Sequence, residues 1–490
     1  MVDVLLFIAG LCLAILSFPA REIWLGGFAW IAFVPLIYLT EKHEIRDRFL
    51  INWLFFYLAF LFLFWLNPTS QASRFENSIV IVPLFILFFL FPVVCTLVIL
   101  LAKHTASKFP IFSRPFIYAG IWLSFEYIMT VIPYGFPLSM AITQANLPFL
   151  LQTVPALGIY GISFLLMTVN AALALAWLYR QRQLLMIAVA IFTINLFWGI
   201  FSLQLAEPIK HPITIGIIQP NKSWEKILLS NNKFFQSLEL DKMGQLSRRL
   251  SQKGHPKLIL WPELAAENYI LQRNDQWLRN LAKEINTPLL IGTYFFDHQT
   301  NKPSNIAALI SETGSTIGIY RKNILFPFIE TELCQTGEEV WPLDFDRGID
   351  QLGVMLCFES LHPRLAGQLV DRGASLLLLM ANGAWFGNNR WPWLHMSFIG
   401  FRALENGRYA IHLNNTGPSV VVSPQGIYGQ ILPQGKTAIA MAEVEGRKGQ
   451  TLYRMSHGAF PMIIMFISTG LIFWSIFFSK GVQGGVEKKS

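Results

Sequence analysis

Long apolar segments separated by short polar ones fill the first 204 residues, after which the pattern changes. Each of the first seven apolar runs is close to the roughly 20 residues that a helix needs to cross the hydrocarbon core of a bilayer. Residues 205–457 have the mixed polarity of a globular domain, and one more apolar run follows. We therefore predict eight transmembrane helices, at about residues 3–20, 24–40, 49–67, 79–101, 115–132, 159–179, 184–203 and 459–479.

These runs divide the chain into three parts. A seven-helix transmembrane domain is expected at residues 1–204, a water-soluble domain at 205–457, and a final helix with its polar tail at 458–490. The middle part is too long to be a loop between two spans, so we expect it to fold around a core of its own.

Within the middle part, the period of the apolar residues alternates between that of a strand and that of a helix. Helical periodicity occurs near residues 228–252, 274–286, 362–372 and 393–407. This alternation predicts an α/β domain in which helices cover a two-layer sheet. The predicted strands are residues 213–219, 258–261, 288–296, 305–310, 316–320, 353–357, 375–380, 409–414 and 419–423.

Basic residues predict the orientation, because Lys and Arg in short loops remain on the cytoplasmic side of a membrane. The loops after the second, fourth and sixth runs are rich in them, whereas other loops carry Arg21 alone or Arg74 alone. We therefore expect both termini in the cytoplasm of a bacterium and residues 205–457 on the periplasmic side of its inner membrane. The basic residues of the cytoplasmic loops are Lys42, Arg46, Arg48, Lys103, Lys108, Arg114, Arg180 and Arg182.

The composition is that of a membrane protein, with 53% hydrophobic and only 14% charged residues. The formal net charge of +8 comes mostly from the cytoplasmic loops, so no nucleic-acid partner is expected. The first run is expected to be a retained helix. A cleaved signal peptide would need a positive start, which Met1, Val2 and Asp3 do not provide, and a clear small-residue cleavage site.

Two of the four cysteines, Cys334 and Cys357, fall in the exported part. In an oxidising compartment they could form a disulfide. Their surroundings argue against it, because Cys334 lies in a polar stretch whereas Cys357 ends an apolar strand. Cys12 and Cys95 lie inside apolar runs and are most simply small core residues. No His and Cys cluster has the spacing of a zinc site, so neither a metal nor a cofactor is expected.

Cys357 is the first candidate for chemistry. A thiol held at the end of a rigid strand can act as a nucleophile if a base and an oxyanion stabiliser lie nearby. Two further predicted strands are followed by charged residues, one by Glu263 and the other by Lys322. Taken singly, Glu263 could cap its turn and Lys322 could be a solvated surface charge. Glu, Lys and Cys at three strand ends, in this order, favour a catalytic site.

The segments Trp261-Pro262-Glu263, Tyr320-Arg321-Lys322 and Cys357-Phe358-Glu359 resemble the carbon–nitrogen hydrolase (nitrilase) superfamily. With seven apolar runs before this region and one after it, the chain resembles the apolipoprotein N-acyltransferase family in particular. The resemblance covers nearly the whole chain and implies a nitrilase-like αββα sandwich for the exported domain. It also includes Asn382-Gly383-Ala384-Trp385-Phe386-Gly387, Arg402-Ala403-Leu404-Glu405, Asn414-Asn415-Thr416-Gly417 and Pro424-Gln425-Gly426.

The resemblance assigns a role to several positions of this chain. Cys357 corresponds to the nucleophile, Glu263 to the general base and Lys322 to the oxyanion stabiliser. The other positions that it implies as supporting or substrate-binding are Glu330, which matches a further essential glutamate, Trp224 and Asn305, which match positions near the acyl site, and Glu359.

Phe358 has two separate points of interest. Its backbone N–H is expected to stabilise an oxyanion together with Lys322. Its side chain stands where many members of the family have Tyr. A second departure is that residues 331–356 form a shorter segment than in the enterobacterial enzyme, where this segment forms a loop over the active site.

The resemblance implies a two-step acyltransferase that acts last in bacterial lipoprotein maturation. A phospholipid, phosphatidylethanolamine by the resemblance, would leave an acyl chain on Cys357 as a thioester. The N-terminal diacylglyceryl-cysteine of an apolipoprotein would then take the chain as an amide. The expected partners are this donor, this acceptor and membrane lipid, and the chain is expected to be a monomer. The alternative is a membrane-bound nitrilase-type amidase or hydrolase, while the intact triad disfavours a non-catalytic scaffold or transporter.

Three further residues allow two interpretations each. Glu126 lies in an apolar run, where a carboxylate is costly and faces the protein interior or a water-filled cavity. It is therefore either structural or part of a lipid entry. Trp391 and Trp393 flank a proline, and amphipathic rings favour membrane interfaces. We expect them at the interface, with a place in the core as the alternative.

Overall fold

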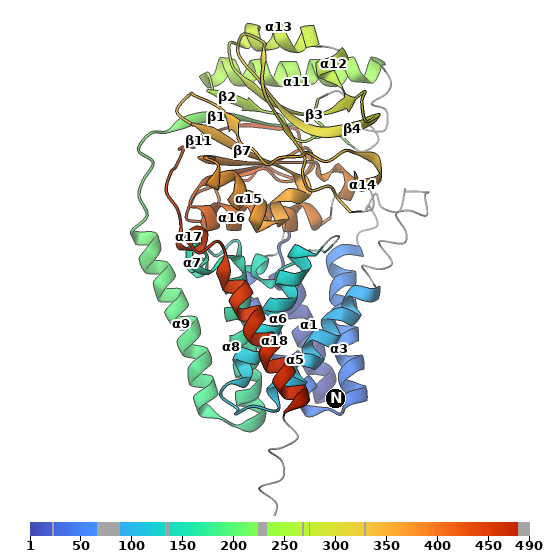
Figure 1. Cartoon of the computed structure of the whole chain (residues 1–490), viewed down its shortest axis with the longest axis vertical. Helices are drawn as coiled ribbons and strands as arrows, with labels where there is room; N and C mark the ends of the chain where they lie inside the picture. The colour runs from blue at the N-terminus through green and yellow to red at the C-terminus, as the bar shows by residue number, and fades with distance from the viewer. Residues whose placement is uncertain are drawn as a thin grey trace, which may run out of the picture. The chain divides into compact units, whose positions relative to one another are not determined.

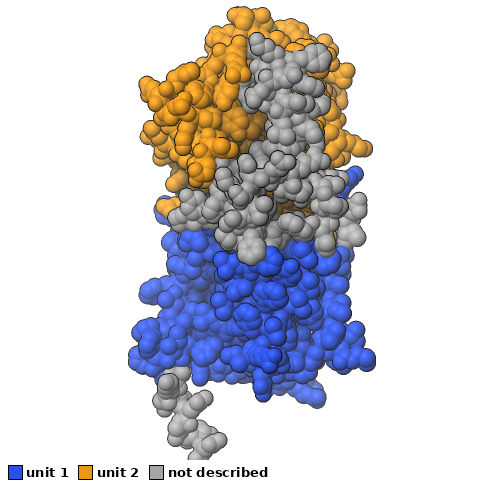
Figure 2. Space-filling view, turned by 90° about the vertical axis from the view of Figure 1, so that its right-hand side faces the viewer, with its two compact units in different colours: residues 1–66, 84–205, 452–490 blue, residues 67–83, 206–451 orange. Residues whose placement is uncertain are grey.

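The computed structural model describes residues 1–21, 24–65, 89–132, 135, 137–223, 233–266, 269–273, 275–327, 330–387 and 389–478. The chain divides into two compact units, coloured separately in Figure 2. The first unit comprises residues 1–66, 84–205 and 452–490, and the second comprises residues 67–83 and 206–451.

Helices build the described part of the first unit (Figure 1). Most of the residues in these helices are apolar. The longer ones are α1 (Val2–Ser17), α3 (Ile45–Phe60), α5 (Phe91–Ala106), α6 (Arg114–Val131), α8 (Ile159–Tyr179), α9 (Arg182–Gln204) and α18 (Ala459–Phe477). The shorter ones are η1 (Gly26–Trp30), α2 (Val34–Lys42), η2 (Leu61–Trp65), η5 (Met140–Gln144), η6 (Pro148–Leu150), α7 (Val154–Leu157) and α17 (Leu452–Met455).

Among the described residues, α8, α9 and α18 are the helices whose length and composition would let them cross a membrane. In α8, 78% of the most apolar window is buried, against 22% in α9 and 17% in α18. Helix α8 therefore lies inside the first unit, whereas α9 and α18 expose apolar side chains. An apolar surface of this extent indicates contact with lipid. The expectation of a membrane protein is supported, and that of eight spans is supported in part.

The expected span at 24–40 is not one helix. The 3-10 helix η1 ends at Trp30, and α2 starts at Val34 with Pro35 in its first turn. Proline is tolerated there, but it cannot continue a helix from the preceding residues, because it lacks an N–H and its ring meets the previous turn. A continuous helix at 24–40 was therefore the wrong expectation.

Asn170 of α8 compensates for this interruption. Its side-chain oxygen accepts a hydrogen bond from the Phe33 N–H at 2.8 Å, and its amide nitrogen donates to the Ala29 carbonyl at 2.9 Å. Backbone groups outside a helix have few partners in apolar surroundings, and each one left unpaired is costly. One buried side chain thus pairs with backbone groups on both sides of the break.

Two sheets form the centre of the second unit. The six-stranded sheet has the order β11-β1-β2-β3-β4-β5, and the five-stranded sheet has the order β10-β9-β8-β7-β6. The strands of the first are β1 (Ile213–Gln219), β2 (Leu258–Leu260), β3 (Leu289–Asp297), β4 (Lys302–Ile310), β5 (Thr316–Arg321) and β11 (Ala438–Val444). Those of the second are β6 (Leu343–Asp344), β7 (Gln351–Leu356), β8 (Leu376–Ala381), β9 (Tyr409–Asn414) and β10 (Val420–Val422).

Parallel pairing explains the position of the helices. Strands β1, β2 and β3 are parallel, as are β7, β8 and β9, and parallel neighbours require a crossover connection that usually contains a helix. In Figure 1 helices cover the outer face of each sheet, so the unit is an αββα sandwich as expected. The helices are α11 (Lys233–Gly254), α12 (Ile270–Arg273) and α13 (Asp275–Ile285) beside the first sheet, and α15 (Pro363–Asp371) and α16 (Trp391–Asn406) beside the second. Short turns are α14 (Glu330–Leu333), η8 (Cys357–Leu361) and η9 (Gly383–Phe386).

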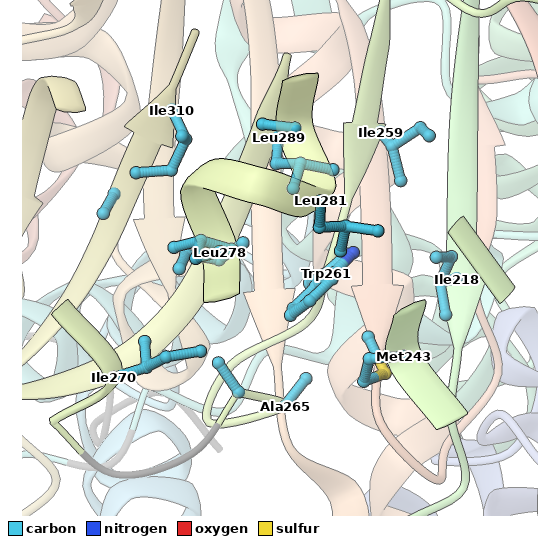
Figure 3. Close-up of a cluster of buried hydrophobic side chains, with 14 of the residues drawn as sticks. Ile218, Met243, Ile259, Trp261, Ala265, Ile270, Leu278, Leu281, Leu289 and Ile310 are labelled. Carbon is cyan, nitrogen blue, oxygen red and sulfur yellow. The ribbon is translucent and has the colours of Figure 1, made fainter. Parts of the chain in front are cut away.

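A buried apolar cluster joins the first sheet to its helices (Figure 3). Trp261, which directly follows β2, belongs to this cluster, and its Nε1 donates to Ser247 Oγ at 3.1 Å. Ile306 of β4 belongs to it as well. Because side chains alternate along a strand, Asn305 faces the opposite side of the sheet, toward the second sheet. The helix α13 contributes Leu278, Leu281, Ala282 and Ile285 at helical spacing.

Candidate active site

Three strand ends supply the residues that the sequence singled out. Glu263 comes shortly after β2, Lys322 directly after β5, and Cys357 directly after β7. The first two strands belong to the six-stranded sheet and β7 to the five-stranded one. The site therefore takes its nucleophile candidate from one sheet and its charged groups from the other.

Lys322 lies between two carboxylates. Its Nζ is 3.2 Å from Oε1 of Glu263 and 2.7 Å from Oε2 of Glu330. The side chains of Lys322 and Glu263 are only 1% and 3% exposed, and that of Glu330 is 15% exposed. A buried ammonium is stable only with opposite charges beside it, so Lys322 is not a solvated surface charge.

Asn305 connects the two carboxylates. Its amide nitrogen donates to Oε1 of Glu263 at 2.8 Å and to Oε1 of Glu330 at 3.3 Å. Its backbone carbonyl accepts the Lys322 N–H at 2.9 Å. Asn305 therefore contacts three expected site residues at once and holds them in a fixed arrangement. Trp224, the remaining position expected near the acyl site, lies outside the described residues.

The charges at this site act on one another strongly. Burial raises the pKa of the Cys357 thiol well above its usual value, the Glu263 charge raises it further, and Lys322 opposes both. Burial also raises the pKa of Glu263, although Lys322 counteracts it. Burial alone would lower the pKa of Lys322, but the two carboxylates hold it well above its usual value. Near neutral pH the resting site thus has a protonated thiol and a charged ammonium.

This combination determines what the site can do. A protonated thiol is a weak nucleophile and needs a base to remove its proton during attack. A carboxylate with a raised pKa is a stronger base than an ordinary one and remains a useful acid afterwards. The ammonium of Lys322 can stabilise negative charge on a substrate oxygen in a site from which water is largely excluded.

The backbone of Cys357 has an unusual conformation. Its φ is +49°, in the left-handed region that non-glycine residues rarely adopt. Such a conformation costs on the order of 1–3 kcal/mol and persists only where the surrounding structure enforces it. The residue lies at the sharp turn from β7 into η8, where its side chain keeps part of its surface exposed.

Glu359 holds this turn against the Lys322 segment. Its Oε1 accepts the backbone N–H groups of Asn323 at 2.6 Å and Ile324 at 3.1 Å, and its Oε2 accepts that of Leu356 at 2.7 Å. The hydroxyl of Tyr320 donates to both oxygens, at 3.0 and 2.9 Å. Burial raises the pKa of Glu359 to about 7, although its three backbone donors favour the charged form.

Two family models match this chain in succession. The model described as the apolipoprotein N-acyltransferase N-terminal domain matches residues 9–172, and the model described as carbon-nitrogen hydrolase matches residues 225–452. The chain is thus similar, over most of its length, to the apolipoprotein N-acyltransferase family.

Relatives named apolipoprotein N-acyltransferase match nearly end to end. The one from Geobacter metallireducens is 27% identical, over 91% of this chain and 90% of its own length. The one from Chlorobaculum tepidum is 24% identical, over 94% of both chains. Among solved structures, Saccharomyces cerevisiae Nit3, a member of branch 10 of the nitrilase superfamily, is 21% identical with a TM-score of 0.39, covering 51% of this chain and 96% of its own.

The structure shows the surroundings of the two departures from the apolipoprotein N-acyltransferase pattern, which are Phe358 and the short segment 331–356. The Phe358 side chain is 3% exposed, and its ring packs edge-on against Phe326 and His362, with centroids 5.2 and 5.1 Å away. The short segment 331–356 is hydrogen-bonded to the first sheet near its start, and it ends in β6 and β7 of the second sheet. The Gln335 N–H donates to the Pro303 carbonyl at 2.8 Å, and the Gly337 N–H donates to the Lys322 carbonyl at 2.7 Å.

Sequence reasoning missed two polar residues behind Cys357, namely His395 and Ser360. Nε2 of His395 lies 2.9 Å from the Cys357 carbonyl oxygen and 3.0 Å from Oγ of Ser360. His395 lies within the helix predicted near residues 393–407, and it belongs to no motif that the sequence analysis recognised. Its position depends on how α16 packs against the second sheet, which a single sequence does not show.

The expectation for Trp391 and Trp393 was wrong. Each is 8% exposed, so both are part of the interior. Trp393 Nε1 donates to Oε1 of Gln434 at 2.6 Å, and Trp391 packs against Phe386 with ring centroids 5.1 Å apart. Cys334 and Cys357 are both free thiols.

Glu126 has several partners in its own unit. Oε1 accepts from Trp122 Nε1 and from the Met140 N–H, both at 2.9 Å, and Oε2 accepts from Ser139 Oγ at 2.8 Å. The side chain is 2% exposed. These contacts favour the structural interpretation of Glu126.

Proposed function

We propose that this chain transfers an acyl chain from a phospholipid to the N-terminal diacylglyceryl-cysteine of an apolipoprotein. The observation that carries the proposal is the succession of an apolipoprotein N-acyltransferase N-terminal match and a hydrolase match, with Glu263, Lys322 and Cys357 at three strand ends of the second. The name of the relatives supplies the lipoprotein substrate. Phosphatidylethanolamine as donor and a monomeric enzyme remain part of the proposal.

The first half-reaction forms a thioester. Glu263 takes the proton of Cys357 as the sulfur attacks the ester carbonyl of the phospholipid. Lys322 and the Phe358 N–H stabilise the negative oxygen of the tetrahedral intermediate. The carbon–oxygen bond then breaks, Glu263 returns the proton to the leaving oxygen, and the lysophospholipid departs.

The second half-reaction reverses these roles. The free amine of the lipoprotein cysteine attacks the thioester carbonyl, and Glu263 accepts a proton from the amine. The same oxyanion donors act again. The carbon–sulfur bond breaks, Cys357 leaves as thiolate and regains its proton from Glu263, and the acyl chain remains on the lipoprotein as an amide.

Mass spectrometry of the peptide that carries Cys357 tests the first half-reaction. After incubation of the full-length protein with phosphatidylethanolamine alone, this peptide should gain the mass of an acyl chain, and neutral hydroxylamine should remove it. The peptide with Cys334 is an internal control, because that thiol is free but only 5% exposed, whereas Cys357 is partly exposed. An adduct that forms only when the acceptor is present would contradict the two-step scheme.

A membrane-bound hydrolase is the second candidate, supported by the carbon-nitrogen hydrolase match. The two candidates differ in the fate of the thioester. An acyltransferase that excludes water should keep the adduct for minutes and discharge it rapidly on addition of a diacylated lipopeptide with a free N-terminus. Rapid release of free fatty acid without acylation of the lipopeptide would favour the hydrolase.

We also propose eight spans in a bacterial inner membrane, with both termini cytoplasmic and residues 205–457 periplasmic. The support is the basic loops, because such loops remain inside. Single cysteines at Gln183 and Gln299, in a background in which all four native cysteines are replaced by serine, test this orientation. A membrane-impermeant maleimide should label the second position in intact spheroplasts and the first only after lysis, and the opposite pattern would reverse the topology.

A further inference from the structure

A buried imidazole holds the backbone carbonyl of the nucleophile candidate. Nε2 of His395 is 2.9 Å from the Cys357 carbonyl oxygen. A carbonyl oxygen only accepts hydrogen bonds, so Nε2 carries the hydrogen and donates it. His395 is 4% exposed and belongs to α16, which is buried along its whole length. The donor is therefore anchored in a rigid element.

The same bond controls the direction of a neighbouring donor. The Cys357 carbonyl and the Phe358 N–H belong to one planar peptide group and point in opposite directions. Whatever holds the carbonyl therefore also determines where the N–H points. The Phe358 N–H lies at the start of η8, where the first N–H groups have no acceptor within the turn. It is thus available to a substrate oxygen.

We propose that His395 is a positioning residue, whose hydrogen bond to the Cys357 carbonyl keeps the Phe358 N–H turned toward the oxyanion of the reacting acyl group. The inference rests on the proposed function only for the assignment of Cys357 as nucleophile.

The strained backbone of Cys357 explains why the hydrogen bond from His395 matters for the turn. With φ at +49°, Cys357 has a conformation that persists only where the surrounding structure enforces it. If the turn relaxed, the Cys357–Phe358 peptide would move with it, and the Phe358 N–H would no longer point toward the oxyanion. Burial lowers the pKa of His395 to about 4, so near neutral pH it donates as an uncharged group.

Ser360 is the competing donor to the same carbonyl. Its Oγ lies 3.2 Å from the Cys357 oxygen, a longer contact than that of His395, and it belongs to the same short turn. A donor inside the turn moves with it, whereas His395 ties the turn to a separate helix. Arg402, also on α16, adds a weak contact at 3.5 Å to the Ser360 carbonyl.

His412 offers a matched control. It is 0% exposed, and its ring centroid lies 5.4 Å from that of His395. Its Nε2 faces the Asn414 amide nitrogen at 3.4 Å instead of the nucleophile turn. Replacing either histidine by leucine removes a buried imidazole, but only one change removes the bond to Cys357.

The experiment compares two reactions of Cys357 in full-length protein. A p-nitrophenyl ester acylates the thiol through a tetrahedral oxyanion, whereas iodoacetamide alkylates it without one. We expect His395→Leu to slow the ester burst by about 10–100-fold, below the full 10²–10³-fold loss of an oxyanion donor. The ester concentration at half-maximal rate and the alkylation rate should stay within about twofold of the wild type, because an oxyanion donor stabilises only the tetrahedral state. His395→Gln should restore most of the burst rate, and His412→Leu should leave it nearly unchanged.

Several outcomes would overturn the inference. These are a normal burst in His395→Leu, a parallel fall of burst and alkylation, an equal effect of His412→Leu, or no burst in the wild type. Because the ester replaces both natural substrates, the test is independent of the proposed lipid chemistry. A normal wild-type burst with no acylation by phospholipid would contradict the proposed function and leave the role of His395 intact.

Discussion

Glu263 and Glu330 approach the same ammonium nitrogen, Nζ of Lys322, at 3.2 and 2.7 Å. One positive charge therefore faces two carboxylates beside a thiol. Where a thiol has a cationic partner without this excess of negative charge, its pKa falls and the thiolate is already present. Here the thiol stays protonated, so in the proposed reaction attack requires transfer of its proton to Glu263. The charges of the two glutamates thus disfavour the Cys357 thiolate in the resting site.

Glu330→Gln should move the pH profile of Cys357 alkylation to lower pH. The negative charge of Glu330 disfavours the thiolate and raises the pKa of Cys357, so removing this charge lowers that pKa. The rate of reaction with iodoacetamide, measured between about pH 7 and pH 10, reports the shift. Lys322→Met provides the opposite control, because loss of the positive charge should move the profile to higher pH. Shifts of the same sign in both variants would contradict this charge arrangement.

Lys322→Met should cost both stability and rate. Breaking a buried ion pair leaves uncompensated charge in the interior, so we expect a loss of about 3–5 kcal/mol in the free energy of unfolding. Loss of the ammonium at the oxyanion should also slow thioester formation by at least about 10²–10³-fold. Thermal unfolding in detergent and mass spectrometry measure the two effects. The double variant Lys322→Met/Glu330→Gln should regain stability but not rate, and a gain in rate would remove Lys322 from the chemistry.

Glu263→Gln should abolish the acyl adduct while the protein remains folded. An amide cannot accept the thiol proton, but it keeps the shape of the side chain and a carbonyl oxygen for the Asn305 hydrogen bond. Mass spectrometry of the Cys357 peptide after incubation with phospholipid measures the loss. The same adduct yield as in the wild type would show that another group removes the proton.

Glu359→Gln should make the free energy of unfolding less dependent on pH. Burial raises the pKa of Glu359 in the folded state to about 7, above the value of about 4.3 for an exposed glutamate. The folded protein therefore binds this proton more tightly, and the stabilisation is present below about pH 4.3 and lost as the pH rises through about 7. Unfolding measured between these pH values should show a decline in the wild type that is smaller in the variant. A steeper decline in the variant would contradict the raised pKa.

Gly292→Ala should displace the proposed base. A Cβ at this position in β3 would lie 2.7 Å from the Cα of Glu263, a backbone atom that cannot easily move away. We expect lower stability and slower thioester formation, because overpacking typically costs about 1–3 kcal/mol. Gly318→Ala in β5 is the control, since its Cβ would meet the end of the Leu343 side chain at 3.1 Å, which can rotate. Equal effects of the two changes would argue against a tight fit at Glu263.

Local patterns were sufficient to predict most of the α/β domain. The runs at 213–219 and 409–414 have the same bounds as β1 and β9. Strand β11 was missed because it is rich in alanine and only half buried, and it pairs with β1 from the far end of the domain. Its existence depends on a partner that its own sequence does not reveal.

The candidate site likewise has some features that one segment of the sequence reveals and others that depend on contacts between distant segments. Charged residues after apolar strands could be found in the sequence, and the structure gathers Glu263 and Lys322. The left-handed backbone of Cys357 and the bond from His395 depend on packing between separate elements. The position of Trp393 was predicted wrongly, because the sequence alone does not distinguish a tryptophan at a membrane surface from one in a protein core. Its N–H finds Gln434 only after folding.

Asn170 shows that a more hydrophobic side chain is not always a more stabilising one within the helical unit. A change to leucine would raise the hydropathy of α8 and improve its score as a membrane span. It would also leave the Phe33 N–H and the Ala29 carbonyl without the partner they share. Asn170→Leu would therefore destabilise the unit although it makes α8 more hydrophobic. Two residues far apart in the sequence thus mark the interruption of the second predicted span: Pro35 at the start of α2, and Asn170 in the mostly apolar helix α8.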